Sequence, residues 1–498
     1  MNVKEVLINN AENYPKKLAL IFKDEPINFL ELKERAFKLA NFLLGLNLKK
    51  EDKVAIYLPN CPEYIFSYLA IFSAGLVAVP LDFLFTENEL ISCLGHAEVK
   101  TLITQPKEDL DLEKIKKEVP SLEKIIFPED LKEIFKTGDV SSPMVEILDS
   151  DHSLIVYSSG TTGRPKGILW NYRHLDSGPM TLKYCVEINE NYTLLCALPL
   201  SHGGGLVYLQ LMLTSGATLV LMERFLPLEF LKNIEKYKVN AFFLVPSMYY
   251  TLLQLKELEN FDLCSLKWIN CFGAAASVDA LRRFHQVCPQ AVFYNGWGMM
   301  ETAPPNVILP TGSDKIESIG KPVPWFSVKI VDENGKELKP NEVGELIVKG
   351  WPVMEGYYKD PELTKEVIRD GWLHTQDLAK IDEEGLIYIL GRVSERIKVG
   401  GLLVYASEVE SVILRHSAVK EVAVVPAPDK LRGEVPFAFV VLKDGFSLSE
   451  DELRSFCRKN LAHFKLPHEF KFITELPKTR TGKIDKGKLK QMVFLKDE

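Results

Sequence analysis

Short apolar runs alternate with helix-length segments along most of the chain. Residues 29–46 have apolar side chains at helical spacing, and residues 53–58 form an apolar run of strand length. Similar short runs lie further along the chain, at residues 99–103, 154–157, 218–222, 241–245 and 268–272. Strands that alternate with helix-sized segments predict an α/β fold with largely parallel sheets.

The stretch from residue 64 to residue 81 has no charged side chain and is just long enough to span a bilayer. It contains Ser73-Ala-Gly75, however, and ends in Val77-Ala-Val-Pro80-Leu81. This order predicts a buried helix that stops at a glycine, followed by a short buried strand closed by proline. We therefore expect no transmembrane segment, and peripheral contact with a membrane stays an open alternative.

The pattern becomes β-rich after about residue 319. Strand-like runs are separated by turns at residues 333–335 and 382–385, and they lie at residues 325–330, 344–348 and 385–390. From Gly391 a compact α+β pattern begins, with helices predicted to open at the capping boxes of Ser407 and Ser449. Strands are predicted between these helices, at residues 422–425 and 436–442.

The expected architecture is thus a large, multi-layer α/β N-terminal domain and a small, mobile α+β C-terminal domain. We place the boundary between residues 390 and 391, so the domains are 1–390, with a β-rich subdomain over 319–390, and 391–498. A chain of 498 residues is too long for one simple core, which favours two domains.

Charge and cysteine content exclude several classes of protein. The net charge of −8 argues against a nucleic-acid partner, whose binding surface would be basic. The eight cysteines are scattered without a C-x-x-C pair, so neither a zinc site nor a disulfide framework is expected. The first residues lack the basic-then-apolar order of a signal peptide. These features predict a cytoplasmic protein with reduced thiols.

The segment Tyr157-Ser-Ser-Gly-Thr-Thr-Gly-Arg-Pro-Lys-Gly167 combines glycines, hydroxyl side chains and two cations directly after a predicted strand. Consecutive backbone N–H groups in such a turn form a concavity that binds anions. A plain surface turn needs one or two glycines but neither four hydroxyls nor two cations. The spacing is not that of a Walker loop, because no Gly-Lys-Ser/Thr follows the first glycine. The segment alone predicts binding of a polyphosphate.

This segment resembles the signature of the adenylate-forming superfamily, which comprises acyl- and aryl-CoA synthetases, peptide-synthetase adenylation domains and beetle luciferases. The resemblance extends over essentially the whole chain. It implies a carboxylic acid substrate and the cofactors ATP, Mg²⁺ and coenzyme A. The loop residues implied to contact the nucleotide are Ser158, Ser159, Gly160, Thr161, Thr162, Gly163 and Lys166.

A second matching segment, residues 295–302, is similar to the family's Tyr-Gly-x-Thr-Glu sequence. The resemblance implies that Glu301, with Thr161, holds magnesium, an ion that prefers oxygen ligands. Trp297 stands where tyrosine is usual and keeps an aromatic face for adenine, whereas Met300 replaces a threonine and removes a hydroxyl. Further nucleotide contacts are implied for Gly273, Ala274, Ala275, Asn295, Gly296, Trp297 and Met300.

Two further segments match the family near the predicted domain boundary. In residues 371–377, Asp377 is implied to accept both ribose hydroxyls, and Gln376 replaces the usual glycine. In residues 391–401, Arg392 is implied to contact ribose or phosphate, and Ser394 stands at the hinge position where the family has Asp or Lys. Lys398, Gly400 and Gly401 are assigned to the same nucleotide and thiol site, with the glycines lining the thiol channel.

Catalytic roles are implied for four residues: Lys483, Glu301, His202 and Thr161. The ammonium of Lys483 can bridge the attacking carboxylate and the α-phosphate, where negative charge accumulates. His202 is implied to orient the carboxylate, with the glycines at 203–205 lining the acyl pocket. His-Gly-Gly-Gly also occurs in lipases, but the chain has no Gly-x-Ser-x-Gly, which counts against a serine hydrolase.

The implied reaction joins a carboxylate, fatty or aryl, to AMP and then to coenzyme A. Alternatives are an adenylating enzyme with another acceptor, such as a carrier protein, a luciferase-type oxygenase and a non-catalytic nucleotide-binding homologue. A peptide-synthetase adenylation domain is disfavoured, since residues 201–206 lack a carboxylate for the substrate's ammonium group. The sequence leaves the acid and the choice between monomer and homodimer open.

Overall fold

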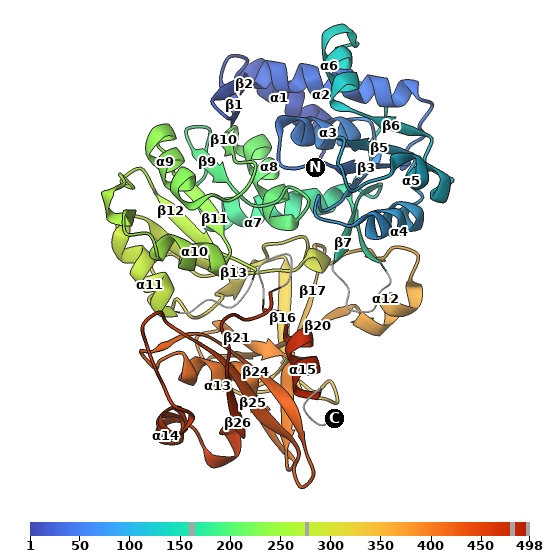
Figure 1. Cartoon of the computed structure of the whole chain (residues 1–498). Helices are drawn as coiled ribbons and strands as arrows, with labels where there is room; N and C mark the ends of the chain where they lie inside the picture. The colour runs from blue at the N-terminus through green and yellow to red at the C-terminus, as the bar shows by residue number, and fades with distance from the viewer. Residues whose placement is uncertain (159–164, 274–277, 479–483, 495–498) are drawn as a thin grey trace. The chain divides into compact units, whose positions relative to one another are not determined.

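The computed structural model describes residues 1–158, 165–273, 278–478 and 484–494. The chain divides into two compact units, Met1–Ser327 with Val348–Leu373, and Val328–Ile347 with His374–Glu498. It passes from one unit to the other within the strands β16 (Phe326–Val331), β17 (Gly344–Gly350) and β20 (Trp372–Ile381) (Figure 1). The bounds of these units differ from those of the predicted domains, and the boundary at 390/391 stays a prediction.

A seven-stranded sheet in the first unit positions the predicted phosphate loop. Its order is β18-β8-β7-β4-β3-β5-β6, in which β7, β4, β3, β5 and β6 are parallel and β8 and β18 are antiparallel additions. The bounds are β3 (Lys53–Tyr57), β4 (Val77–Pro80), β5 (Thr101–Thr104), β6 (Lys124–Ile126), β7 (His152–Ser158), β8 (Lys166–Asn171) and β18 (Gly356–Tyr357). The accompanying helices are α2 (Phe29–Gly45), α3 (Pro62–Ser73), α4 (Glu87–Ala97), α5 (Leu112–Glu118), α6 (Pro128–Thr137) and α12 (Pro361–Val367).

The uncharged stretch at residues 64–81 folds as the sequence predicts. Helix α3 begins with Pro62 at its first position, where a missing N–H costs nothing, and its side chains from Tyr64 to Ser73 are buried. Gly75 then takes a φ of 68° and turns the chain into the buried strand β4. No helix among the described residues is long and apolar enough to cross a bilayer.

A nine-stranded sheet forms the rest of the first unit, in the order β15-β14-β13-β12-β11-β9-β10-β1-β2. The six strands from β13 to β1 are parallel, and the edge strands are antiparallel. The bounds are β1 (Leu18–Phe22), β2 (Glu25–Asn28), β9 (Thr193–Cys196), β10 (Thr218–Leu221), β11 (Ala241–Leu244), β12 (Trp268–Cys271), β13 (Val292–Trp297), β14 (Val307–Ile308) and β15 (Lys321–Pro322). The helices are α1 (Val3–Asn13), α7 (Ser177–Cys185), α8 (Gly203–Ser215), α9 (Pro227–Tyr237), α10 (Pro246–Leu253) and α11 (Val278–Val287).

The β-rich region and the α+β region follow the predicted change of pattern. Strands β16, β17 and β20 form a five-stranded sheet with β19 (Ile368–Arg369) and β21 (Ile387–Arg392). A second five-stranded sheet has the order β23-β22-β25-β24, with β26 parallel to β25. Its bounds, with those of its helices, are β22 (Arg396–Val399), β23 (Leu402–Tyr405), β24 (Val419–Asp429), β25 (Gly433–Leu442), β26 (Glu469–Phe472), α13 (Ala406–Ile413), α14 (Glu450–Asn460) and α15 (Lys486–Phe494).

One of the two predicted capping boxes is present and the other is wrong. Ser449 caps α14, accepting a hydrogen bond from the backbone N–H of Glu452, whose side chain returns to Ser449. Helix α13, however, begins at Ala406, and its N-cap is Tyr405. Tyr405 still pairs with Arg396 as the last residue of β23, so the helix starts directly at the strand end and Ser407 falls inside it.

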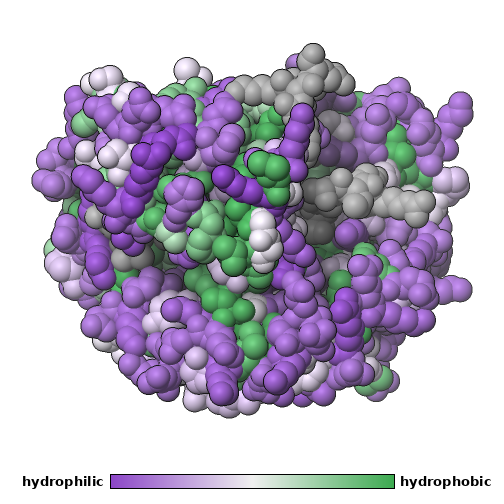
Figure 2. Space-filling view, turned by 90° about the horizontal axis from the view of Figure 1, so that it is seen from below, coloured by the Kyte–Doolittle hydropathy of each residue, from purple (hydrophilic) through white to green (hydrophobic). Residues whose placement is uncertain are grey.

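Figure 2 shows the distribution of hydrophilic and hydrophobic residues on one face of the molecule. On the face shown in Figure 2, hydrophilic residues predominate and hydrophobic residues gather in smaller patches. Such patches are ordinary, because more than half of a folded protein's surface comes from apolar atoms.

Helix α9 offers a matched test of the core of the nine-stranded sheet. Leu231 is 0% exposed and packs with Phe230 and Ile234, whereas Leu228, on the same helix, is 43% exposed. We expect Leu231→Ala to lower the free energy of unfolding by about 2–5 kcal/mol, since it leaves a cavity. Leu228→Ala should cost about 1 kcal/mol or less. Urea denaturation followed by circular dichroism measures both, and equal losses would contradict the burial of this face.

Candidate active site

The predicted phosphate loop connects two antiparallel strands. The backbone of Ser158, at the end of β7, pairs with that of Lys166, at the start of β8. Residues 159–164, and with them Ser159, Gly160, Thr161, Thr162 and Gly163, lie outside the described residues, so their assigned contacts stay predictions. What the structure provides is the base of the loop: a hairpin that brings Lys166 opposite Ser158.

Tyr157, the residue before Ser158 on β7, anchors the start of the loop. Its ring is buried, and its hydroxyl lies 2.8 Å from Nδ1 of His96, on α4. Burial raises the pKa of the Tyr157 hydroxyl, which therefore stays protonated at neutral pH. The strand that enters the loop is thus tied to a helix on one face of the sheet.

The strand that leaves the loop leads to the predicted magnesium ligand. The backbone N–H of Tyr358 donates to the carbonyl of Gly167 at 2.7 Å, next to the pairing of Tyr357 with Ile168. From β18 the hydroxyl of Tyr357 donates to Oε1 of Glu301 at 3.0 Å. Burial, and then the Glu301 carboxylate, raise the pKa of Tyr357, so the hydroxyl remains a donor. Sequence reasoning missed Tyr357, which lies in a segment with no recognised motif.

The backbone around Glu301 is held from two further sides. Glu301 lies in the short 3₁₀ helix η3 (Met300–Thr302). The indole N–H of Trp170, on β8, donates to the carbonyl of Met300 at 2.8 Å, and the N–H of Met354 donates to the carbonyl of Glu301 at 2.9 Å. Strand β8 therefore contacts this segment both directly and through β18, which fixes the position of the carboxylate relative to Lys166.

Met300 faces the start of α8. A Cβ atom built on Gly203 would lie 2.5 Å from the sulfur of Met300, so the thioether rests on the bare backbone of the glycine. The hydroxyl usual at this position is thus replaced by an apolar group that packs beside His202. The sequence identified the replacement, and the structure shows what the thioether contacts.

His202 is the N-cap of α8 and lies between a hydroxyl and a carboxylate. Its Nδ1 is 2.9 Å from Oγ of Ser201, and its Nε2 is 3.9 Å from Oδ2 of Asp82. In a serine-hydrolase triad the carboxylate holds Nδ1 and the serine faces Nε2. The two nitrogens have the opposite partners here, and Ser201 is buried, so the geometry does not support a hydrolase.

The residues assigned to the adenine side lie at the ends of β12 and β13. A Cβ on Gly296 would lie 2.6 Å from the Phe272 ring, so glycine is needed for this approach. Asn295 donates from Nδ2 to the carbonyl of Ile316 at 3.1 Å. Trp297 is buried and packs against Phe326, with ring centroids 6.5 Å apart. Gly273 has a φ of 90°, while Ala274 and Ala275 lie outside the described residues.

In the second unit the structure brings Asp377 and Arg392 together. They are direct partners in the pairing of β20 with β21, and Nε of Arg392 lies 3.0 Å from Oδ1 of Asp377. Arg392 also donates to the carbonyl of Thr375, whose hydroxyl accepts the N–H of Asp377. A buried carboxylate needs such partners, and they hold Asp377 in one orientation.

Gln376 keeps the backbone conformation that favours glycine. Its φ is 61°, in the left-handed region, where glycine is the residue with the least strain. The strain of this conformation is offset by Glu345, whose Oε1 accepts from the backbone N and from Nε2 of Gln376 at 3.1 and 3.0 Å.

The segment assigned to the thiol channel follows in the same unit. Gly400 and Gly401 have φ values of 56° and 86°, and a Cβ on either would meet nothing within 4 Å. Within this unit the turn conformation, rather than crowding, is what requires glycine. The backbone N–H of Lys398 donates to Glu434 at 2.9 Å, and its side chain is exposed.

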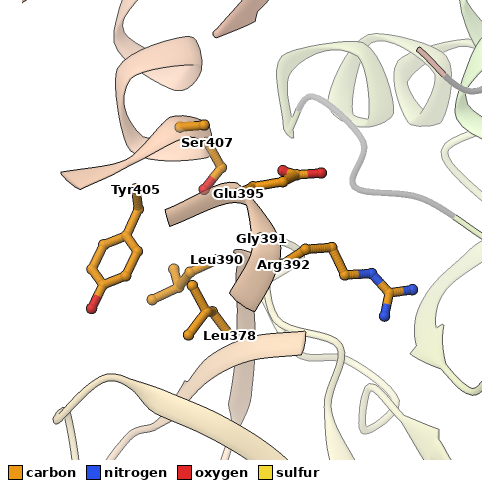
Figure 3. Close-up of a pocket in the computed structure, with 8 residues that line it drawn as sticks. Leu378, Leu390, Gly391, Arg392, Glu395, Tyr405 and Ser407 are labelled. Atoms are coloured by element: carbon orange, nitrogen blue, oxygen red, sulfur yellow. The ribbon is translucent and has the colours of Figure 1, made fainter. Parts of the chain in front are cut away.

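A small pocket lies just before this segment, beside Gly391. Figure 3 shows Leu378 and Leu390 turned toward Tyr405, whereas the charged groups of Arg392 and Glu395 extend away from these apolar side chains. The charged groups of Arg392 and Glu395 are therefore separated from the apolar side chains that line this pocket.

The glycines that follow His202 give a matched test of the site's backbone. A Cβ on Gly205 would lie 2.3 Å from the carbonyl oxygen of Pro199, whereas one on Gly204 would meet only the end of the Leu198 side chain. We expect Gly205→Ala to lower the free energy of unfolding by about 1–3 kcal/mol, because backbone must move. Gly204→Ala should stay within about 1 kcal/mol of the parent. Denaturation of both variants checks this, and a harmless Gly205→Ala would contradict the described turn.

Comparison with known proteins identifies the family to which the chain belongs. A family model described as AMP-binding enzyme matches residues 7–358, and one described as AMP-binding enzyme C-terminal domain matches residues 408–483. The two matches include the predicted loop, Glu301 and Lys483.

Relatives match over nearly the full length. The chain is 35% identical to a long-chain-fatty-acid–CoA ligase of Bacillus subtilis, over 98% of this chain and 94% of that protein. It is 32% identical to a feruloyl-CoA synthase of Amycolatopsis sp, over 97% of both. The structure of ATP-bound MatB from Rhodopseudomonas palustris is 29% identical, covers 99% of both chains and has a TM-score of 0.92. These matches confirm the resemblance seen in the sequence: the chain belongs to the AMP-binding enzymes of the adenylate-forming superfamily.

Proposed function

We propose that this protein is an AMP-forming acid–thiol ligase, which activates a carboxylic acid with ATP and transfers it to coenzyme A. The observation that carries the proposal is the fixed position of Glu301 beside the phosphate-loop strand. Tyr357 and Trp170 attach η3 to β8, so the carboxylate and Lys166 belong to one rigid part of the first unit. Relatives named long-chain-fatty-acid–CoA ligase and feruloyl-CoA synthase support coenzyme A as the acceptor of the acyl group.

In the first half-reaction an oxygen of the substrate carboxylate attacks the α-phosphorus of ATP. The bond from this phosphorus to the pyrophosphate oxygen breaks, which gives an acyl-adenylate and pyrophosphate. Ser158, Lys166 and the intervening loop hold the phosphates, and Asp377 with Arg392 holds the ribose. Lys483 supplies positive charge to the α-phosphate, where an in-line displacement builds negative charge.

The residues near Glu301 fit a magnesium ion. Its carboxylate is oriented by the Tyr357 hydroxyl, and carboxylate oxygen is the ligand that Mg²⁺ prefers. Among the described residues no three acidic, histidine or cysteine side chains gather into a cage made of protein alone. One carboxylate together with substrate phosphates is the usual way in which proteins hold this ion. When bound, Mg²⁺ would neutralise charge on the phosphates.

In the second half-reaction the thiol sulfur of coenzyme A attacks the carbonyl carbon of the acyl-adenylate. The carbon–oxygen bond to AMP then breaks, the thioester forms, and the thiol proton passes to solvent. Gly400 and Gly401 present bare backbone in the segment assigned to this step. The thioester, AMP and pyrophosphate are the products.

For the acid we propose a fatty or aryl carboxylate. The first turn of α8 presents backbone N–H groups beside His202, and a helix N-terminus attracts a carboxylate. The rest of α8 is apolar and buried, so the environment behind this polar end suits an apolar acyl group. A cytoplasmic location, where ATP and coenzyme A are abundant, completes the proposal.

The test measures AMP release with coenzyme A across short, medium, long-chain and aromatic acids, together with the variant Lys483→Ala. We expect Lys483→Ala to slow acid-dependent pyrophosphate exchange by at least about 10²-fold, because a fixed charge at the α-phosphate is lost. Thioester formation from supplied acyl-adenylate should stay within about twofold of the parent.

Lys488→Ala is the matched control, since Lys488 lies nearby on α15 with its side chain 65% exposed. Exchange without any coenzyme A transfer would favour another acceptor, and nucleotide binding without exchange would favour a non-catalytic homologue. Equal loss of both half-reactions in Lys483→Ala would remove Lys483 from its assigned role.

Tyr357→Phe tests the orientation of Glu301. Removing the hydroxyl frees the carboxylate to rotate, and loss of such an outer partner commonly costs about 10–100-fold in metal affinity or activity. We expect the Mg²⁺ concentration for half-maximal pyrophosphate exchange to rise by about tenfold. Tyr358→Phe is the control, because the Tyr358 ring packs edge-on against His96 and lies beneath the ammonium groups of Lys53 and Lys359, contacts that a phenylalanine ring keeps. An unchanged Mg²⁺ dependence in Tyr357→Phe would contradict the role of Glu301.

A further inference from the structure

The first residue of α15 forms an ionic cluster that the reaction described above does not use. Nζ of Lys486 lies 2.8 Å from Oε2 of Glu395 and 2.9 Å from Oε1 of Glu410. The three side chains are only 18%, 26% and 17% exposed. Burial alone would lower the pKa of Lys486, but the carboxylates of Glu410 and Glu395 outweigh it and raise the pKa, which keeps the ammonium charged.

The two carboxylates belong to different parts of the second unit. Glu410 lies on α13, and its Oε1 also accepts the backbone N–H of Val424, on β24, at 2.6 Å. It is therefore part of the body of the α+β region. Glu395 lies in the 3₁₀ helix η4 (Val393–Glu395), the short segment that contains the hinge position Ser394. Lys486 thus joins the body of this region to the hinge segment.

A second bond links the same helix to the hinge. Nζ of Lys490, one turn along α15 from Lys486, donates to the carbonyl of Ser394 at 3.2 Å. Leu489 and Val493 are buried in the core of the unit, so α15 is a rigid support for both lysines. Rotation of the chain at the hinge would have to break or carry along these bonds.

The N-terminal end of α15, where Lys486 lies, is also the end that leads to Lys483, the lysine assigned to catalysis. Lys486 follows Lys483 by three residues. Two contacts join the ends of the segment that contains Lys483: Lys478 pairs with Ile484, and the N–H of Asp485 donates to the carbonyl of Pro477 at 2.8 Å. Nζ of Lys478 lies 2.7 Å from Glu421, on β24. The two ends of the segment that contains Lys483 are therefore held next to Lys486, the residue that forms an ion pair with Glu395 in the hinge segment.

We propose that Lys486 and Glu395 are positioning residues for the first half-reaction: their ion pair sets the base of the Lys483 segment relative to the hinge. The proposal rests on the proposed role of Lys483. A displacement of about 1 Å at a catalytic group can cost about 10²-fold in rate, so a partly buried ion pair at this point has a direct kinetic consequence.

The test separates the ion pair between Lys486 and Glu395, in the hinge segment, from the ion pair between Lys486 and Glu410, within the α+β region. Glu395→Gln removes the carboxylate charge in the hinge segment and leaves the ion pair between Lys486 and Glu410, so we expect the fold to be retained. We expect pyrophosphate exchange at saturating ATP and acid to slow by about 10–100-fold. Thioester formation from supplied acyl-adenylate, and the KM for the acid, should stay within about twofold of the parent.

Two matched variants distinguish positioning from stability. Glu410→Gln removes the pair inside the α+β region, and we expect its melting temperature to fall while the ratio of the two half-reactions stays that of the parent. Lys488→Met, on the exposed side of α15, should change neither. Lys486→Arg preserves the charge and should recover most of the exchange rate that Lys486→Met loses.

The outcomes keep this inference separate from the proposed function. If Lys483→Ala abolishes exchange and Glu395→Gln leaves it unchanged, the positioning role is wrong and the ligase remains. If Glu395→Gln slows both half-reactions equally, or slows exchange only in proportion to lost thermal stability, the ion pair is structural and the inference fails. If Lys483→Ala leaves pyrophosphate exchange intact, the catalytic role assigned to Lys483 is wrong, and the positioning role that rests on it is wrong as well.

Discussion

The hydrogen bond from the Tyr357 hydroxyl to Glu301 is the contact on which the arrangement of the first unit's site depends. Tyr357 is placed by β18, which pairs with the strand that leaves the phosphate loop. Trp170, on that same strand, holds the carbonyl of Met300. One strand therefore fixes both the end of the loop and the carboxylate. Electrostatic catalysis requires groups that are already in place before charge develops, so fixing the Glu301 carboxylate in one position favours this kind of catalysis.

Local patterns in the sequence predict many of the helices and strands. The uncharged stretch at residues 64–81 reads correctly as α3, a glycine turn and β4, because burial, the glycine at positive φ and the closing proline all act locally. Ser449 is recognised as an N-cap for the same reason. The prediction at Ser407 is wrong, because the pairing of Tyr405 with Arg396 in the hairpin of β22 and β23 determines where α13 begins, and a capping motif does not reveal that pairing.

The parts of the site that escape sequence reasoning are long-range contacts. Tyr357 and Glu301 lie 56 residues apart, and Gly205 needs to be glycine only because Pro199 folds back on it. Gln376 shows the reverse case. Its side chain stands where glycine is usual, and Glu345, from a neighbouring strand, accepts two hydrogen bonds that hold the left-handed conformation. No spacing of residue types encodes such compensation.

The segment from Asp377 to Arg396, which contains the predicted hinge position Ser394, is held by a small number of ion pairs. Arg392 is held on β20 by Asp377, and Glu395 is held on α15 by Lys486. Arg396 is held in turn by Glu333 at 3.0 Å. Val393 and Ser394 are the two residues between the first two ion pairs, and the backbone carbonyl of Ser394 accepts a hydrogen bond from Lys490. Ser394, at the predicted hinge position, has no charge of its own, and its neighbours carry the charges that fix the segment on either side.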